Sequence, residues 1–542
     1  ILRAPPISSP IITYVRKLYE LSSDERQKFL RETGKRIHRP YLFRKNSVRI
    51  AILGGGQEIG GNAFLIQTKE SNILIDAGAR VGAVEPRNIF PAFNISEFLI
   101  EELDAIVITH AHLDHSWFIP LVREDVPVYM NKIAYLVYRA TMGKPKQGRS
   151  IVDKNVTGEL PAFSNINLLT TRGKGLETIE LDDLKIHYGP VDHSVPGAYA
   201  YALEWENHLL LYTGDFRLHG IFTEKAVSIF DVLEDARGDF EKLILITEGT
   251  NWGSEEPFLN EKQVERTVRE LLRRHYRSFK VAIALVSPSD VDRVRELLKA
   301  ACLAAAEEGQ ELIPFVDHGV AKLLALINSE KIKLLEPLPV LGGKIEAKAA
   351  TVDGVTLRGK SEVLCVLLLG EKRYTKAGKA RKGDWHGYLV HTLNVDDNCI
   401  IDFRTLSGKL ESNENERYFI LLSSFNLEPF YLKKMFKPGT LVLFSMSEPF
   451  KEELVLDYQK KLNQLLALGA RIARVHTSGH IRPEDHIDFL ARLKPDVVIP
   501  VHSEHPYYII HLLEMAKAKN KDLKWDPKPL IPQPKSWIPV KP

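Results

Sequence analysis

The chain has 542 residues, 26% of them charged, and its 73 Lys and Arg against 70 Asp and Glu leave a formal net charge of +3. That length exceeds what one hydrophobic core usually organises, so we expect two domains, and the balanced charge permits a nucleic-acid partner without requiring one. No apolar run approaches the ~18 residues of a membrane span and no signal-peptide core is found, which predicts a cytoplasmic protein without membrane contact.

Residues 1–46 are predicted to form a mainly helical extension, with a helix start near Ser22. From Val48 a strand runs into the glycine-rich segment 54–62, and a second strand begins at Ala63. A nucleotide-binding loop would be followed by a helix, so we predict a β-hairpin instead. A third strand ends at Asp76.

The central motif is Thr109-His110-Ala111-His112-Leu113-Asp114-His115, directly after the apolar run 103–108. In an extended segment, side chains two residues apart point the same way, so His110 and His112 can bind one cation. Asp114 and His115 follow where a predicted helix begins and can be aimed at a second cation. A two-metal site needs ions roughly 3.5–4 Å apart, and this turn is compact enough to supply half of both ligand sets.

This motif resembles the signature of the metallo-β-lactamase superfamily. On that resemblance, the acid that ends the third strand, Asp76, orients a metal-binding imidazole without touching the ion. His193 follows a predicted strand near Ile186 and is the expected third imidazole of the first metal. Asp215 follows the buried strand 209–213 and is the expected bridging carboxylate.

The pattern changes after the strand 243–247, which ends in Glu248. Helices at 264–276 and 290–307 alternate with a strand at 281–286, which predicts an inserted α/β domain. Within the irregular stretch 344–411, residues 372–382 hold six basic side chains. This basic run is either a solvated loop or a contact to a phosphate backbone. The chain then returns to a His-rich segment at 475–480, a helix at 483–493 and a strand at 497–501 that ends at His502.

The late histidines extend the resemblance to the β-CASP nucleases, and within them to RNase J and its archaeal relatives. Glu248, His480 and His502 match the motif A acid, the motif B histidine and the motif C histidine. The implied fold class is α/β, a metallo-β-lactamase αββα sandwich with an inserted α/β β-CASP domain. The expected segments are the extension 1–46, the first part of the sandwich at 47–247, the insert at 248–465 and the rest of the sandwich with a tail at 466–542.

The resemblance also implies a ligand set and a cofactor. His110, His112 and His193 would hold one ion, Asp114, His115 and His502 the other, and Asp215 would bridge them. Imidazole-rich shells suit two Zn²⁺ ions, with Mn²⁺ as the alternative.

The implied reaction is hydrolysis of RNA by a metal-activated hydroxide. Asp114 would accept the proton of the water, and His480, held by Glu248, would protonate the leaving oxygen. His476, Ser478, Gly479 and His480 would form a phosphate cradle. The implied partner is single-stranded RNA, degraded from a 5′-monophosphate end in the 5′-to-3′ direction, and the oligomeric state is left open between a homodimer and a homotetramer.

Three other functions remain open from the sequence. An endoribonuclease of the RNA 3′-end-processing type would share every ligand named above. A small-molecule hydrolase of the same superfamily would use the same metals, although it would not need the motif A, B and C residues or a domain-sized insert. A catalytically dead scaffold that only binds RNA would lose ligands, and here every expected position is filled.

Overall fold

The structure is a computed structural model. It describes residues 26, 48–80, 89–93, 95, 102–142, 164–171, 176–221, 223, 227–254, 259–330, 334, 338–341, 351–352, 355–356, 364–368, 372, 378–380, 385–412, 416–423, 436, 439–446, 452–520, 524–533 and 537–540. Apart from Arg26, the predicted N-terminal extension lies outside the described residues, and so does most of the basic run 372–382.

The first sheet has seven strands in the order β23-β1-β2-β3-β4-β5-β6. Their bounds are β1 Val48–Gly54, β2 Ala63–Gln67, β3 Asn72–Ile75, β4 Ala105–Ile108, β5 Val128–Asn131, β6 Ile166–Leu169 and β23 Trp537–Val540. β1 and β2 pair antiparallel, which confirms the hairpin predicted around the glycine-rich segment. β3 to β6 are parallel, so the carboxyl ends of β3 and β4, where Asp76 and the central motif follow, meet at one edge.

The second sheet also has seven strands, in the order β22-β21-β11-β10-β9-β8-β7. Their bounds are β7 Glu177–Leu181, β8 Leu184–Pro190, β9 Tyr199–Trp205, β10 His208–Tyr212, β11 Lys242–Glu248, β21 Val497–Val501 and β22 Lys528–Pro529. β7 to β10 form an antiparallel meander, whereas β10, β11, β21 and β22 run parallel. β21 therefore lies directly beside β11, although a large segment of chain separates them.

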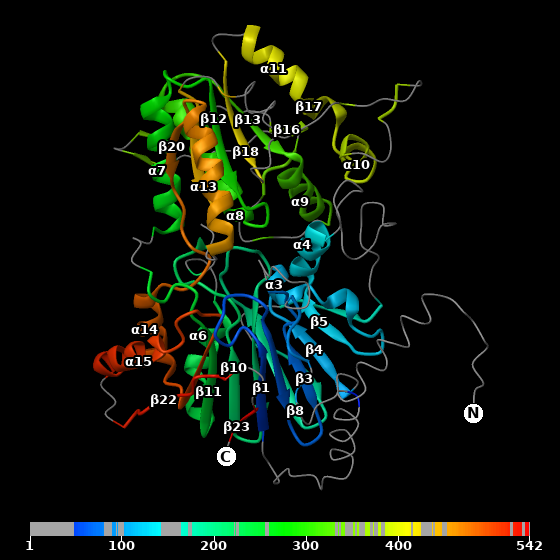
Figure 1. Ribbon diagram of the computed structural model, residues 1–542, viewed down its shortest axis with the longest axis vertical. Coiled ribbons are helices and arrows are strands. Elements are labelled where there is room, and N and C mark those ends of the chain that lie inside the picture. The colour runs from blue at the N-terminus through cyan, green and yellow to red at the C-terminus, as the bar shows by residue number, and fades with distance from the viewer. Residues whose placement is uncertain are drawn as a thin grey trace, which may run out of the picture.

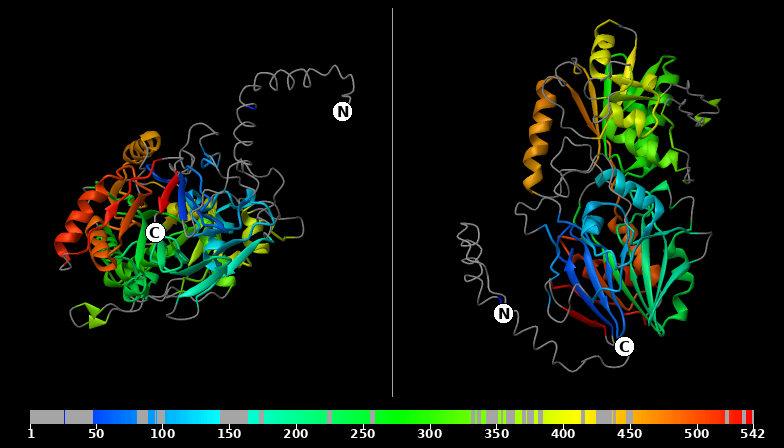
Figure 2. Two further views of the ribbon diagram at one scale, coloured as in Figure 1. Left: turned by 90° about the horizontal axis from the view of Figure 1, so that it is seen from below. Right: turned by 90° about the vertical axis from the view of Figure 1, so that its right-hand side faces the viewer.

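The two sheets pack face to face through one apolar core (Figure 2, right). Alternate residues of a strand point to opposite faces, so Ile50 and Ile52 of β1 and Leu210 and Tyr212 of β10 fill this core. The other face of the second sheet is covered by α6 (Ile229–Asp235), α14 (Pro483–Leu493) and α15 (Tyr508–Lys519). The other face of the first sheet packs against α4 (Lys132–Met142). This order of layers confirms the αββα sandwich.

The third sheet belongs to the inserted α/β unit, above the sandwich in Figure 1. Its seven parallel strands have the order β17-β16-β13-β18-β12-β19-β20. Their bounds are β12 Val281–Val286, β13 Leu312–Asp317, β16 Cys365–Leu368, β17 Ile400–Asp402, β18 Arg417–Leu422, β19 Leu441–Ser445 and β20 Arg471–Arg474. A two-stranded hairpin, β14 (Thr351–Val352) and β15 (Val355–Thr356), stands apart.

Helices lie on both faces of the third sheet. One face packs against α7 (Glu261–His275), α8 (Val291–Glu307), α9 (His318–Ser329) and α10 (Trp385–His391). The opposite face packs against α11 (Phe403–Ser412) and α13 (Glu452–Ala467). α4 of the sandwich touches α9, and one apolar cluster continues from the sandwich into the insert, so the two units meet in a shared core. The described part of the chain contains no helix long and apolar enough to cross a membrane.

Several predicted elements agree with the structure and two differ. The helix at 483–493 and the strand at 281–286 are confirmed. The helix after the central motif is shorter than predicted. It is a single turn, α3 (Leu113–Ser116), followed by the 3₁₀ turn η3 (Ile119–Leu121). Pro120 lacks the amide hydrogen that a continuing helix would need. The stretch 344–411 is not uniformly irregular, because β16, β17, α10 and α11 lie within it. The predicted domain boundaries at 47, 248 and 466 stay predictions.

Candidate metal centre

The loop after β4 is held in place by Asp76, at the end of β3. The Asp76 carboxylate accepts hydrogen bonds from the backbone N–H of Thr109 at 2.8 Å and from the Thr109 hydroxyl at 2.9–3.0 Å. A Cβ atom at Gly78 would lie 1.6 Å from the backbone oxygen of Asp114, so only glycine allows this close approach. The two loops are locked together at the carboxyl edge of the first sheet.

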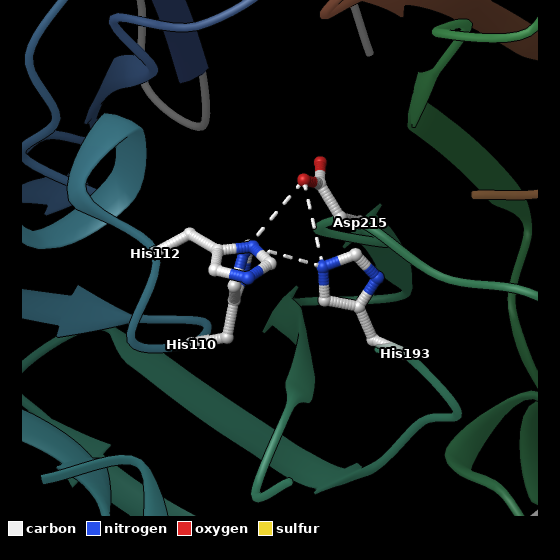
Figure 3. Close-up of side chains that lie close together, drawn as sticks. All are labelled: His110, His112, His193 and Asp215. Carbon is white, nitrogen blue, oxygen red and sulfur yellow. Dashed lines mark hydrogen bonds and ion pairs between the residues drawn. The ribbon is translucent and has the colours of Figure 1, made fainter. Parts of the chain in front are cut away.

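Four side chains from three segments meet in the first donor group (Figure 3), namely His110, His112, His193 and Asp215. His112 Nδ1 lies 3.1 Å from both His110 Nε2 and His193 Nε2. Asp215 Oδ2 lies 3.6 Å from His110 Nε2 and 3.9 Å from His193 Nε2. In a tetrahedron with metal–nitrogen distances of 2.0–2.1 Å, the donor atoms are about 3.3 Å apart, so this group has the size of a zinc-like site.

Two rings of the first group are oriented by contacts to their Nδ1 atoms, on the side away from the donor centre. His193 Nδ1 donates to the backbone oxygen of Gly479 at 2.7 Å, and His110 Nδ1 lies 3.0 Å from the Thr109 hydroxyl. With these nitrogens engaged, the Nε2 atoms of His110 and His193 point toward the shared centre. Hydrogen bonds of this kind fix the tautomer of a metal-binding imidazole.

The second donor group consists of Asp114, His115 and His502. His502 Nε2 lies 3.2 Å from Asp114 Oδ2, and His115 Nε2 lies 3.9 Å from the same oxygen. His115 Nδ1 donates to Asp76 Oδ2 at 2.7 Å, which directs Nε2 into the group. Asp76 thus touches an imidazole and not the donor centre, as the superfamily resemblance implies.

Asp215 belongs to both sides of the centre. Its Oδ2 lies 3.2 Å from His115 Nε2 in the second group, besides its contacts in the first. Its Oδ1 is buried and has no hydrogen-bond partner. A buried carboxylate oxygen without a partner is costly, whereas a cation on either side would satisfy it. The donor set and this orphaned oxygen both fit a pair of divalent cations.

The protonation states of the first donor group suit metal binding, whereas Asp215, Asp76 and Asp114 outweigh burial and raise the pKa of His115 in the second group well above its ordinary value. Burial, together with the neighbouring imidazoles, lowers the pKa of His110 and His193 well below the ordinary value, and burial lowers the pKa of His112 to about 4. Burial opposes ionisation of Asp215, but His115 and His502 outweigh it and keep the pKa of this carboxyl well below its usual range. Neutral imidazoles and an ionised carboxylate are the forms that bind cations.

A third group brings Glu248 and His480 beside Asp215 and His502. His480 Nδ1 lies 3.1 Å from both oxygens of Glu248, and the hydroxyl of Thr250 lies 3.1 Å from the same nitrogen. Because Nδ1 is engaged in this way, Nε2 is the ring nitrogen of His480 that is left to act on another group.

The segment 476–480 crosses over the first donor group. A Cβ atom at Gly479 would lie 2.6 Å from Ser194 Oγ and 3.1 Å from His193 Cε1, so this backbone packs directly on a ring of the first donor group. Ser478 Oγ accepts from the backbone N–H of His480 and from the side-chain amide of Asn251, both at 3.1 Å. His476 Nδ1 lies 3.2 Å from Arg293 Nη1.

The structure adds four side chains to the predicted set. Asn62 contacts His115 Nε2 at 2.9 Å, Tyr212 donates to Asp76 at 3.0 Å, and Thr250 lies 2.8 Å from His502 Nδ1. Thr109, the fourth, anchors the central motif as described above. All four lie within a few residues of a motif that the sequence offers, but their hydrogen bonds to side chains from other segments give no signal in the sequence.

The four-layered sandwich therefore carries two His- and carboxylate-rich donor groups at one edge, with Asp215 of the first group also beside His115 of the second. The model of the metallo-beta-lactamase superfamily matches residues 56–246, and the model described as the Zn-dependent metallo-hydrolase RNA specificity domain matches residues 466–517. The chain thus contains a metallo-β-lactamase domain followed later by an RNA specificity domain, and these two matches are consistent with the β-CASP branch of the superfamily. A metallo-β-lactamase domain implies divalent metal ions as cofactors.

Two relatives carry the same description, transcription termination factor FttA. The protein from Methanothermobacter thermautotrophicus is 32% identical over 292 residues, covering 51% of this chain and 43% of the relative. The protein from Thermococcus kodakarensis is 28% identical over 354 residues, covering 60% of this chain and 50% of the relative. The chain thus spans about half the length of the curated relatives it matches.

One solved structure is similar along most of the chain. A crystal structure of a protein of unknown function from Enterococcus faecalis V583 has a TM-score of 0.61 and 16% sequence identity, and the match covers 91% of this chain and all of the other. At this identity the likeness concerns the fold alone.

Proposed function

We propose that this protein is a metal-dependent ribonuclease that hydrolyses phosphodiester bonds of single-stranded RNA. The observation that carries the proposal is the position of Asp215, which belongs to the first donor group, lies 3.2 Å from His115 Nε2 of the second group and lies 3.8 Å from His480 Nδ1. The match to an RNA specificity domain at 466–517 supports RNA as the substrate, since this range includes His476, His480 and His502.

His110, His112 and His193 would hold one cation, Asp114, His115 and His502 the second, and Asp215 both. Bound there, two divalent cations, Zn²⁺ or Mn²⁺, would supply a water of lowered pKa and positive charge for the phosphoryl oxygens. Asp114 lies on the second donor group and is the carboxylate available to accept a proton from an attacking water. Imidazole-rich donors favour Zn²⁺ over Mn²⁺.

His480 and Glu248 supply the acid. Glu248 binds the Nδ1 side of the ring, stabilises its protonated form and leaves Nε2 to deliver a proton to the leaving 3′ oxygen. Gly479 and Ser478, in the same segment, would hold a phosphate beside the first donor group. His476 would contribute to this cradle through its place in the loop, since its Nδ1 faces Arg293.

The resemblance to RNase J extends the proposal to 5′-to-3′ removal of nucleotides from RNA that carries a 5′-monophosphate. Endonucleolytic cleavage is the alternative mode. The relatives' description as transcription termination factors favours a transcript as the RNA in either mode. Both modes use the same side chains, so they are distinguished by whether cleavage requires a 5′-monophosphate on the RNA.

The test is degradation of an end-labelled single-stranded RNA with a 5′-monophosphate, beside the same RNA with a 5′-hydroxyl, with added Zn²⁺ or Mn²⁺. Mononucleotides released only from the monophosphate RNA indicate the exonuclease mode, and internal fragments from both RNAs indicate the endonuclease mode. His112→Ala should abolish either reaction. His187→Ala is the matched control, because His187 lies on β8 and binds Glu204. Absence of cleavage with either metal would refute the proposal.

A further inference from the structure

A buried row of four alternating charges runs from the metal loops into the inserted unit. It consists of Asp192, Arg217, Glu261 and Arg293, all buried. Arg217 Nε donates to Asp192 Oδ1 at 2.8 Å, and Arg217 Nη1 donates to Glu261 Oε1 at 2.7 Å. Arg293 completes the row with Nε on Glu261 Oε2 and Nη2 on Glu261 Oε1, both at 2.9 Å. We call these four residues the charge row.

One end of the charge row is attached to the donor groups. Asp192 directly precedes His193, and Arg217 follows Asp215 by two residues. The backbone N–H of Arg217 also donates to the backbone oxygen of Asp192 at 2.8 Å. Any shift of the Arg217 side chain therefore acts on the two loops that carry His193 and Asp215.

The other end is attached to the phosphate-cradle segment. Arg293 Nη1 donates to Ser445 Oγ at 3.0 Å and lies 3.2 Å from His476 Nδ1, and Arg293 Nη2 donates to the backbone oxygen of Thr477 at 3.3 Å. Burial and the Arg293 charge lower the pKa of His476 to about 3, so its Nδ1 accepts from the guanidinium. Arg293 thereby fixes the start of the segment that ends at His480.

Glu261 stands where the chain enters the inserted unit, and Thr477 where it leaves. Glu261 is the first residue of α7, and the Thr477 hydroxyl donates to the backbone oxygen of Leu259 in the entering segment. The segment that enters the inserted unit and the segment that leaves it are thus joined to each other, and Glu261 connects both to Arg217 of the sandwich.

The row is buried and closely packed. A Cβ atom at Gly220 would lie 2.3 Å from Asp192 Oδ1 and 2.4 Å from Arg217 Nε, so the backbone covers this pair directly. Burial acts against ionisation of Glu261, but Arg293 and Arg217 outweigh it and lower its pKa to about 2. Well-packed apolar residues often replace a buried ion pair without loss of stability, so stability alone gives little reason for such a row. Directional hydrogen bonds between charged groups can instead hold the loops of His193 and Asp215 at a fixed position relative to the segment 476–480. Apolar side chains would not do so.

We propose that Glu261 is a positioning residue, which through Arg217 and Arg293 sets the phosphate-cradle segment 476–480 at a fixed position over the metal-binding loops. The proposal deepens the function proposed above and rests on it. Each residue then has a separate role. Arg217 positions the loops of the donor groups, Arg293 positions the phosphate-cradle segment, and Glu261 affects both because it binds both arginines.

The experiment compares Arg217→Lys, Arg293→Lys and Glu261→Gln with the wild type in two independent measurements. The first is the affinity of the metal-free protein for Zn²⁺, by titration calorimetry. The second is KM and kcat for a single-stranded RNA with a 5′-monophosphate. Lysine keeps the charge but loses the planar fork that binds two partners at once. Glu270→Gln is the matched control, because Glu270 lies on the same helix and pairs with Arg274 at the surface.

We expect Arg217→Lys to weaken Zn²⁺ binding at least tenfold with KM unchanged within threefold. Arg293→Lys should raise KM at least tenfold with Zn²⁺ affinity unchanged within threefold, and Glu261→Gln should do both. If the charge row had a merely structural role, each of the two lysine variants would change both readouts together or neither. Equal effects of the two lysine variants on both readouts, or no effect of either, would therefore overturn the proposal.

Two further steps keep the result interpretable. If Glu261→Gln does not fold, the double variant Glu261→Gln/Arg293→Met removes one charge of each sign and should show both defects. If the wild type does not cleave the RNA, the proposed function fails, but the charge row is still tested. The Zn²⁺ measurement then stands, and fluorescence anisotropy of the same RNA replaces KM. Cradle and metal defects that do not separate in these binding measurements would refute the positioning role by itself.

Discussion

His480 and Glu248 lie 232 residues apart in the chain, yet His480 Nδ1 is 3.1 Å from both oxygens of the Glu248 carboxylate. Glu248 ends β11, and His480 lies in the segment by which the chain returns from the inserted unit. The pair joins the strand after which the chain enters the insert to the segment by which it returns. The proton donor of the proposed reaction therefore lies between the two connections of the insert.

Glu248→Gln should lower kcat by about 10²-fold or more, the lower end of what a positioned acid contributes. The amide cannot stabilise the protonated imidazole, while the donor groups around Asp215 keep their ligands. Single-turnover cleavage measures the rate, and elemental analysis of the purified variant measures the metal content. A variant that loses a metal ion would show that Glu248 is itself a ligand, contrary to the role proposed here.

Asp76→Asn should weaken Zn²⁺ binding by about 10- to 100-fold, the usual cost of removing a carboxylate behind a metal-binding histidine. Asp76 is fully buried and accepts from His115 Nδ1 at 2.7 Å, and the amide either donates or accepts weakly there. Asp76 has a φ of 59°, which asparagine tolerates, so the backbone conformation survives the change.

Asp182→Asn is the control for this measurement. Asp182 also has a positive φ, of 39°, but it lies exposed in the turn between β7 and β8. Calorimetric titration of the metal-free proteins gives both affinities. Equal Zn²⁺ affinity of the two variants would contradict the role of Asp76.

Gly479→Ala should reduce kcat/KM for RNA by tenfold or more, while the fold remains intact. The added Cβ would lie 2.6 Å from Ser194 Oγ and 3.1 Å from His193 Cε1, so the cradle segment must move off the first donor group. A displacement of about 1 Å in a reacting site can cost up to 10²-fold. Steady-state cleavage measures the loss, and circular dichroism checks the fold. Gly238→Ala is the control, because an added Cβ atom at Gly238 would meet nothing within 4 Å. Gly309→Ala is less suitable, because the φ of 63° at Gly309 would add backbone strain.

Asp290→Asn should stabilise the protein at alkaline pH and have little effect near pH 4. Burial raises the pKa of Asp290 to about 7, with Arg293 opposing the shift without cancelling it. Because the folded-state pKa lies above the unfolded value, the stabilising contribution of the protonated form is complete below about pH 4 and is lost as the pH rises toward 7. Asparagine has no such charge to bury, and it caps helix α8 as well as aspartate does.

The measurement is thermal unfolding at pH 4.5 and pH 8. One pKa unit corresponds to about 1.4 kcal/mol, so the rise from 3.8 to about 7 bounds the gain at about 4 kcal/mol. Asp396→Asn, an exposed cap of the short helix η5 (Asp397–Cys399), is the control. A gain of equal size at both pH values would contradict the assignment to Asp290 ionisation.

The sequence was most informative where chemistry is concentrated within a few residues. His110, His112, Asp114 and His115 stand together, and the helix at 483–493 begins at a proline after Arg482, so both could be predicted. The αββα sandwich was implied by the family resemblance that the histidine motif carries, and the α/β insert was predicted from the helix–strand alternation after Glu248. Pro120, which ends the helix after the motif, is also visible in the sequence, but its effect was not anticipated.

The parts that could not be predicted depend on contacts between distant segments. Thr250 reaches His502, and Glu261 reaches Arg217 and Arg293, through hydrogen bonds that leave no local pattern. The strand Cys365–Leu368 lies within the uninterrupted apolar run 363–369, and without alternation such a short run does not distinguish a buried strand from a buried helix. Such elements are defined by the neighbours that the fold provides and not by their own composition.

β21 lies beside β11 in the second sheet but is synthesised only after the whole insert. His110, His112, His193 and Asp215 all precede Glu248, so every member of the first donor group has been made before translation of the insert begins. His502 follows about 250 residues later, which at 5–20 residues per second is roughly 10–50 s. A nascent chain thus contains the residues for one cation well before it contains those for two. The ribosome delivers the inserted unit, and with it His480, ahead of the ligand that completes the centre, so a truncated product ending before His502 has no complete second donor group.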